Sequence, residues 1–140
     1  IVSNAAVSEI KEYYRRAAIF WHACGLDEDR PERVEHFGMT TVEAMQNYCV
    51  PIVIDGGGQR EIVQHDDSGF RFSTLEELKS LSLAIMKDKE RCQQMAAQAF
   101  SRSQLFSQEV FKAKFQQLLD DVELELLGRD SLSRIESRAY

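Results

Sequence analysis

The chain has 140 residues, of which 44% are hydrophobic and 29% charged, the balance of an ordinary globular domain that is long enough to bury a core. Its formal net charge is −6 and it has no dense block of Lys or Arg, which argues against a nucleic-acid partner because phosphates require a basic face. No apolar run approaches the ~20 residues that cross a bilayer, and no signal peptide is visible.

The cysteines indicate a reducing compartment. Cys24, Cys49 and Cys92 are odd in number and widely spaced, with no C-x-x-C pair, so the sequence supports neither a disulfide framework nor a zinc ribbon. Cys24 lies close in sequence to His22 and His36, but their spacing matches no known set of metal ligands, and we expect no metal. We therefore expect a cytoplasmic protein.

The first half of the chain alternates between short apolar runs and amphipathic or charged segments. In chain order the pattern predicts a helix over 8–17, a strand within 18–23, a charged loop over 24–34, a helix from Thr40 to about Asn47, a strand over 50–54, a turn over 55–59, a helix over 60–64 and a strand over 69–72. The two main strands are apolar throughout, as expected when helices cover both faces of a parallel sheet. The alternation predicts an α/β fold, a Rossmann-like open parallel sheet with flanking helices.

From Thr74 onward the pattern contains only helices. Thr74 and Glu77 form a capping-box signature for one helix, a second helix covers about 90–100, and Ser107 caps a third. The apolar stripe of the third helix, which we expect to be core, consists of Phe111, Phe115, Leu118, Leu119 and Val122. Residues 128–140 have little apolar content, so we expect a domain over 1–127 followed by a disordered tail.

Two glycine-containing turns flank the predicted strand over 50–54. "EHFGMTT" precedes the helix at Thr40, and "DGGGQRE" follows the strand. Ligands of open parallel sheets bind outside the carboxyl ends of the strands, and the N–H groups at a helix start can take an anion. The helix dipole alone contributes only ~0.3–1 kcal/mol for an exposed charge, so tight phosphate binding needs several N–H groups or a cation. Neither turn matches a nucleotide-binding motif, and a connecting turn with positive φ would equally explain the glycines.

Two glutamates bracket the first of these turns. Glu35 precedes Gly38 and Glu43 follows it, with seven residues between the two glutamates. Glu43 could instead close a capping box that begins at Thr40, and Glu35 could be an ordinary loop carboxylate. The arrangement predicts that both carboxylates face one pocket, with the Gly38 amides between them. A sugar joined to a diphosphate and a ribose requires such a site, with hydroxyl acceptors at both ends and N–H donors in the middle.

The stretch "EHFGMTTVEAMQNYCVPIVIDGGGQREIVQHDDSGFRF" resembles the signature of retaining glycosyltransferases built from two Rossmann-like domains, the GT-B fold. More closely, it resembles the sucrose-synthase-like family, the glycosyl transferases group 1, whose Glu, seven residues, Glu-Ala-Met pattern it contains. The resemblance runs from about Tyr14 to Phe72, and "FSQEVF" near Ser107 resembles the late helix start of that family. It implies that the chain is a C-terminal, nucleotide-sugar-binding domain.

The resemblance also implies a role for individual positions. Glu35 would contact hydroxyls of the donor sugar near the reacting carbon and would be the catalytic residue. The implied nucleotide-sugar-binding positions are Phe37, Gly38, Met39, Thr40, Glu43, Gly57 and Gly58. Among them, the backbone of the first turn would approach the sugar and diphosphate, Glu43 would accept hydrogen bonds from the ribose, and the glycine loop with Glu61 would shape the pocket. Such enzymes generally need neither metal nor cofactor, because helix amides and basic side chains stabilise the departing diphosphate.

Parts of the family pattern are not recognisable in this chain. In members of the family, the basic residues that bind the diphosphate come from an earlier strand and loop, and the acceptor site comes from the N-terminal domain. We therefore expect this chain to be a fragment that lacks its N-terminal domain and is inactive alone. The full-length parent would act on a saccharide or a lipid-linked acceptor, in the latter case at the periphery of a membrane. Cys49 stands where the family commonly has a glycine-containing segment, and we expect it to pack in the core.

Two other functions remain open from the sequence. One is a non-catalytic interaction domain that keeps the Rossmann-like fold and docks through the helices after Thr74. The other is a sugar epimerase of similar two-domain build, which the combination of "EHFG" and "EAM" fits less well. A truncated sheet would also expose an unpaired strand edge, which predicts self-association.

Overall fold

The computed structural model describes residues 3–28 and 30–136. The chain divides into two compact units, an α/β unit (Ile1–Leu105) and a helical unit (Phe106–Tyr140). Within the described residues, no helix combines the length and the apolar character needed to cross a membrane.

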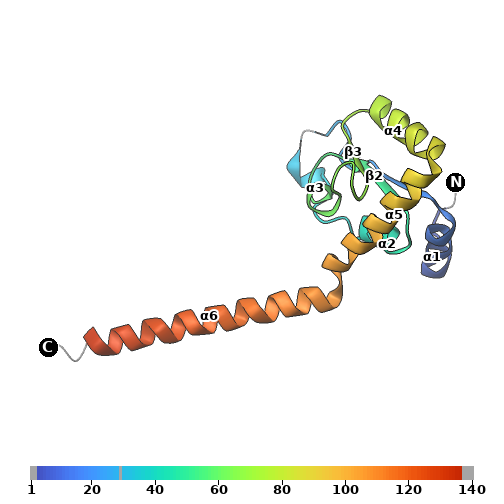
Figure 1. Ribbon diagram of the computed structural model, residues 1–140. Coiled ribbons are helices and arrows are strands. Elements are labelled where there is room, and N and C mark those ends of the chain that lie inside the picture. Colours follow the sequence, from blue (N-terminus) through green and yellow to red (C-terminus); the bar gives the residue numbers. More distant parts are fainter. Residues whose placement is uncertain (1–2, 29, 137–140) are drawn as a thin grey trace. The chain divides into compact units, whose positions relative to one another are not determined.

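The α/β unit is built on a three-stranded parallel sheet with strand order β1-β2-β3 (Figure 1). The strands are β1 (Ile19–His22), β2 (Val50–Ile54) and β3 (Phe70–Phe72). Ile19 pairs with Val50 and Ile52 with Phe70, so β2 is the central strand. The predicted open parallel sheet is therefore confirmed.

Helices pack against this sheet. They are α1 (Val7–Arg16), α2 (Met39–Gln46), α3 (Gln59–Ile62), α4 (Leu75–Lys87) and α5 (Lys89–Ser103), with two short 3-10 turns, η1 (Pro31–Arg33) and η2 (Gln104–Phe106). Of these, α2, α4 and α5 are in contact with the strands. The observed helices agree with the predicted ones to within a few residues. At the start of α4, the Thr74 hydroxyl accepts a hydrogen bond from the Glu77 amide at 3.2 Å, as the capping signature predicted.

The two main strands differ in burial. All five residues of β2 are buried, and the core cluster joins three of its residues to Phe70, Phe72, Ile85, Met95 and Ala96. In β1, by contrast, Trp21 is 60% exposed, although Phe70 and Phe72 of the other edge strand, β3, are buried. The prediction of a fully buried strand is right for β2 and wrong for Trp21. Its indole N–H nevertheless donates to the Ser82 hydroxyl of α4 at 3.1 Å.

Cys49 packs in the core directly before β2, as predicted. It is fully buried, and its thiol donates to the carbonyl oxygens of Tyr14 and Ala17 at 3.2 and 3.3 Å. Burial raises the pKa of this thiol to about 11. The thiol therefore ties the end of α1 to the start of β2 and stays protonated at neutral pH.

The helical unit consists mainly of α6 (Gln108–Glu136). Its predicted cap is present, since the Val110 amide donates to the Ser107 hydroxyl at 3.2 Å. The five apolar side chains predicted as core are 45–67% exposed, so this unit does not bury them by itself. The backbone is helical through Glu136, past the start of the tail predicted from residue 128, and the remainder of that tail (137–140) lies outside the described residues.

Candidate functional site

The two glycine turns lie against each other at the carboxyl ends of β1 and β2. The Gly58 amide donates to the carbonyl oxygen of Glu35 at 3.0 Å. A Cβ atom added at Gly57 would lie 2.1 Å from that same oxygen, and one added at Gly58 would lie 2.3 Å from the carbonyl oxygen of His36. Only residues without a side chain allow so close an approach between the two backbones. The glycines thus bring together two segments that the sequence separates.

Gly38 lies directly before α2, which starts at Met39, one residue earlier than the predicted Thr40. It is the N-cap, with φ of 95° in the left-handed region, and the amides of Thr41 and Val42 donate to its carbonyl oxygen. No side chain caps this helix end, so the capping box considered for Thr40 and Glu43 is not formed. The reason is the glycine, which reaches the required φ without strain and makes the start of the helix independent of a hydroxyl.

Glu35 is held by backbone amides of its own turn. Its Oε1 accepts hydrogen bonds from the amides of Phe37 at 3.3 Å and Gly38 at 3.2 Å. Its Oε2 lies 3.6 Å from Nε2 of His22, at the carboxyl end of β1. The side chain remains 33% exposed, so it keeps acceptor capacity toward solvent. Two of the amides predicted to approach a sugar diphosphate are therefore occupied by this carboxylate.

Glu43 lies in different surroundings, on the side of α2 that faces α1. It lines a cavity of about 460 Å³ together with Lys11, Tyr14 and Gln46. Burial first, and then the nearby negative charge of Glu43, raises the pKa of Tyr14 above its ordinary value. The structure thus brings Glu35, Gly38, Gly57 and Gly58 together and does not bring Glu43 into that cluster.

The other predicted positions of the first turn are open to solvent. Phe37 is 50% and Met39 69% exposed, and Thr40 is also exposed. Glu61 is exposed on α3 and lies one residue beyond Arg60. Gly38 itself is buried between these exposed neighbours.

The structure adds His22 and Gln59 to the site. Gln59 is completely buried, and its Nε2 lies 3.3 Å from Nδ1 of His22. It also lies directly under Gly38, where an added Cβ atom would come within 2.7 Å of Nε2. The sequence pattern had marked Gln59 only as the end of a turn and His22 only as a rejected metal ligand. A histidine at the carboxyl end of a parallel strand was the signal that could have identified the site residue.

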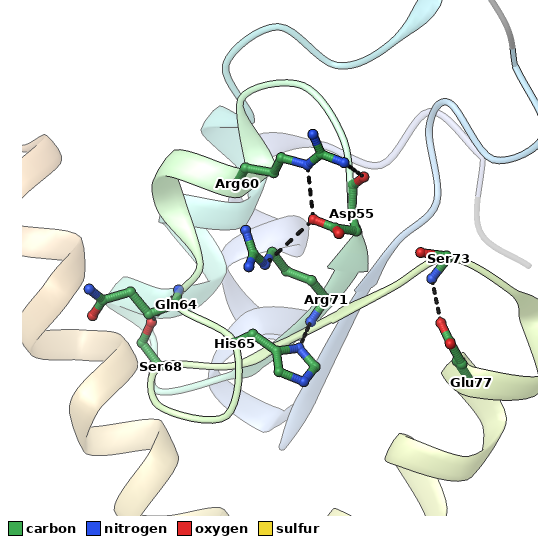
Figure 2. A network of polar contacts seen from close by, with 8 residues as sticks. All are labelled: Asp55, Arg60, Gln64, His65, Ser68, Arg71, Ser73 and Glu77. Atoms are coloured by element: carbon green, nitrogen blue, oxygen red, sulfur yellow. Dashed lines mark hydrogen bonds and ion pairs between the residues drawn. The ribbon is translucent and has the colours of Figure 1, made fainter.

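A polar network borders the second glycine turn (Figure 2). Oδ1 of Asp55, directly after β2, accepts a hydrogen bond from Nε of Arg60 at 3.0 Å and lies 3.6 Å from Nε of Arg71. The Arg60 guanidinium also donates to the Asp55 carbonyl oxygen at 2.9 Å, and the Arg71 amide donates to Nδ1 of His65 at 3.0 Å. The network ties the glycine turn to β3, and the sequence did not predict it.

A cavity of about 560 Å³ lies beside this network and the second turn. Its lining includes Val34 from the segment before the first turn, Gly57 from the second turn, and Asp55 and Arg60. Among the described residues, no group of three or more His, Cys, Asp or Glu side chains is arranged to hold a metal ion. What this edge of the sheet offers a ligand is backbone N–H groups, a partly exposed carboxylate and two arginines that are paired with Asp55.

The match to a known protein family falls within the α/β unit. A family model described as glycosyl transferases group 1 matches residues 2–102. The chain is 33% identical over 82 residues to a GDP-Man:Man(3)GlcNAc(2)-PP-Dol alpha-1,2-mannosyltransferase of Dictyostelium discoideum, an alignment that covers 58% of this chain and 16% of that protein.

Solved structures show the same fold. The HepE protein of Anabaena, in complex with UDP and glucose, matches with a TM-score of 0.68 and 22% identity over 81% of this chain and 30% of that one. The C-terminal domain of a glycosyl transferase group 1 family protein (LpcC) from Francisella tularensis matches with a TM-score of 0.58 and 21% identity over 73% of this chain and 49% of that one. The chain thus spans less than half of these proteins.

Proposed function

The chain belongs to the glycosyl transferases group 1 family, and from this premise we propose that it supplies the donor-binding part of a retaining glycosyltransferase. The donor would be a UDP- or GDP-linked sugar and the acceptor a saccharide or a lipid-linked saccharide. Relatives described as a GDP-mannose-dependent mannosyltransferase and as a complex with UDP-glucose support this class of donor. The acceptor would be bound by another part of a longer protein, so we expect this chain alone to be inactive, and metal ions not to be required.

The observation that carries the proposal is the backbone contact between the two glycine turns. It places the Glu35 carboxylate, the Gly38 amide and the Gly57–Gly58 loop at one point on the carboxyl edge of the sheet. This edge is where open parallel sheets bind ligands. In the proposed complex, Glu35 accepts hydrogen bonds from hydroxyls of the donor sugar near the reacting carbon, and the backbone of Phe37–Thr40 approaches the sugar and diphosphate.

Donor binding on these residues requires Glu35 to move. Its carboxylate occupies the amides of Phe37 and Gly38, and a diphosphate brought to the same amides would meet a like charge. The carboxylate can leave the amides because it is partly exposed, and the sugar hydroxyls then replace the lost donors. The diphosphate in turn gains the two freed N–H groups at the start of α2. The exchange links the arrival of the donor to the orientation of the proposed catalytic residue.

Glu43 has a separate place in this proposal. The cavity that it lines with Tyr14 lies between α1 and α2, one helical turn beyond Met39. Its carboxylate and the Tyr14 hydroxyl offer the kind of polar groups that bind ribose hydroxyls. We therefore place the nucleoside on the α1 side of α2 and the sugar on the side of the glycine turns.

A second candidate function is a non-catalytic interaction domain. It is favoured by the charge of the cavity beside the second turn, whose lining, within the part of the chain that the structure describes, holds the three carboxylates of Asp27, Glu28 and Asp55 but only one guanidinium, that of Arg60, which is itself paired with Asp55. A leaving diphosphate needs more positive charge than the helix dipole supplies. In the enzyme, that charge would have to come from another segment.

Titration of the chain with UDP-glucose and GDP-mannose, followed by backbone amide NMR, tests the proposal. We expect the amide signals of Phe37–Thr40 and Gly57–Gly58 to shift, since the donor replaces Glu35 on the first turn. Free glucose is the control and should leave these signals in place. If millimolar donor leaves both turns unperturbed, the chain is not a donor-binding domain and the interaction domain is favoured.

A further inference from the structure

The side chain of Gln59 is an amide that the proposed function does not use. It is completely buried at the first position of α3, and its Oε1 has no hydrogen-bond partner within the described residues. Such a group costs stability, because a buried polar atom without a partner has lost its hydrogen bonds to water and gained none in return. The other end of the amide, Nε2, faces the imidazole of His22. A cost of this kind indicates that the contact with His22 has a function.

We propose that Gln59 is a positioning residue, which holds His22 in the tautomer protonated at Nε2 and through it orients the carboxylate of Glu35. The catalytic meaning of that orientation rests on the proposed function, whereas the orientation itself does not. Gln59 touches neither sugar nor diphosphate in the proposed complex.

Of the two neutral tautomers of His22, the partners of its ring nitrogens fit only the one protonated at Nε2. The Gln59 Nε2 group can only donate, and at 3.3 Å from Nδ1 it requires a lone pair on that ring nitrogen. The proton then resides on Nε2, which lies 3.6 Å from Oε2 of Glu35, an atom that can only accept. The other neutral tautomer would place two donors opposite each other on one side of the ring and two acceptors on the other side.

Steric contacts fix the Gln59 amide in this place. The backbone of Gly38 lies against it, so closely that an added Cβ atom would approach Nε2 to 2.7 Å. The ring of His22 is in turn packed beside Phe20, with 6.3 Å between the ring centroids. The three groups Gln59, His22 and Glu35 therefore form one chain of contacts beneath the first glycine turn.

The consequence for Glu35 is that a third N–H group faces its carboxylate, at 3.6 Å and so just beyond hydrogen-bond distance. The amides of Phe37 and Gly38 hold Oε1, and the ring N–H of His22 faces Oε2. When the donor substrate takes the two amides, as proposed above, His22 is the contact that remains. Gln59 would thus keep the Glu35 carboxylate pointing toward the glycine turns during that exchange.

Long-range ¹⁵N–¹H NMR of the histidine rings in the chain tests this inference without any sugar. At about pH 8, where an ordinary histidine is neutral, we expect His22 to show a pyridine-type Nδ1 and a pyrrole-type Nε2 signal. A predominant Nδ1–H tautomer, or a rapidly exchanging mixture, in the unmodified chain would overturn the proposal. His36 and His65 provide the reference signals in the same spectrum.

The near-isosteric variant Gln59→Met sharpens the test. Loss of one hydrogen bond of ordinary strength should lower the ratio of Nε2–H to Nδ1–H at His22 roughly 3- to 10-fold. The matched control Gln64→Met changes an exposed glutamine of the adjoining segment and should leave the ratio unchanged. An unchanged ratio in a folded Gln59→Met protein contradicts the proposal. If that variant does not fold, the tautomer in the unmodified chain decides.

The outcomes also separate this inference from the proposed function. If UDP-glucose and GDP-mannose fail to bind while His22 holds the Nε2–H tautomer, the donor assignment fails and the positioning role of Gln59 stands. If the donors bind while His22 populates both tautomers, the positioning role fails and the donor assignment stands.

Discussion

Glu35 and Glu43 stand eight positions apart in one sequence pattern but lie in different surroundings. Glu35 is held between two backbone amides and His22, at the point where the two glycine turns meet. Glu43 is exposed on the α1 side of α2, where it lines a cavity with Tyr14 and its charge raises the pKa of that tyrosine. The first carboxylate is held by backbone amides, whereas the second lies beside another side chain. Spacing therefore identified both residues but not the direction in which each points.

The difference has a simple geometric origin. Glu35 precedes the left-handed Gly38, so its side chain can fold back onto the amides that follow it, whereas Glu43 lies inside a regular helix and points away from the helix axis. The orientation of Glu35 therefore depends on the path of the backbone through Gly38. The surroundings of Glu43 depend instead on how α1 packs beside α2. Changes to the glycines should therefore disturb Glu35 and spare Glu43.

The largest effect that distinguishes the two regions is expected from Gly58→Ala. The added Cβ atom would lie 2.3 Å from the carbonyl oxygen of His36, a backbone atom that can move only if the two turns separate. We expect the free energy of unfolding to fall by about 2–3 kcal/mol, as for other overpacked sites. Urea denaturation measures the loss, and amide spectra should change at Glu35 more than at Tyr14.

Gly56→Ala is the matched control for that variant. Its added Cβ atom would meet only a methyl group of Val34, at the ordinary contact distance of 3.5 Å. Its free energy of unfolding should therefore stay close to that of the unmodified chain. Equal destabilisation by Gly56→Ala and Gly58→Ala would show that the contact between the turns is not what makes Gly58 necessary.

A smaller effect on the free energy of unfolding is expected from Tyr14, and only at high pH. Its pKa in the folded chain is raised above the ordinary 10.0, first by burial and then by Glu43. The unfolded chain therefore loses this proton first, so the associated stability is complete below about pH 10 and is lost as pH rises through the folded pKa. Glu43→Gln should lower the pKa of Tyr14 toward its ordinary value and make this loss shallower.

NMR titration of ring-labelled tyrosine measures the Tyr14 pKa directly, and urea denaturation across the same pH range measures the loss of stability. Glu35→Gln is the control, because Glu35 belongs to the other region and should leave the Tyr14 pKa unchanged. A Tyr14 pKa that responds equally to both substitutions would contradict the separation of the two carboxylates.

Local patterns were sufficient to predict most of the α/β unit. The apolar run of β2 predicted a buried parallel strand because that strand is covered on both faces, and Thr74 predicted a helix start because its hydroxyl satisfies a nearby amide. The exposure of Trp21 was not predictable, because an edge strand has the same apolar sequence as a central one. The apolar stripe of α6 shows the same limit of local patterns, since helical periodicity reveals that a helix has an apolar face but not what covers that face.

The candidate site was predictable only in part. The glycines and glutamates of the first turn could be singled out, because their spacing is visible within one segment, and their role as a donor site stays a prediction. Gln59 and His22 were missed, since their contact joins residues 37 positions apart. The start of α2 at Met39 instead of Thr40 depends on the φ of 95° at Gly38, which the sequence permits without requiring it. Long-range contacts, and not the local pattern, decide which of the acidic side chains share a site.

Steady-state kinetics of the longer protein that would contain this chain tests the account most directly. In that protein, Glu35→Gln should lower kcat for sugar transfer by roughly 100-fold with little change in the KM for the donor, the scale of loss known for removal of one positioned catalytic group. Glu43→Gln should instead raise the donor KM by about 3- to 10-fold, as expected for a lost ribose hydrogen bond, and leave kcat nearly unchanged. An unchanged kcat in Glu35→Gln, or the same kinetic defect in both variants, would contradict the assignment of two carboxylates to two separate tasks.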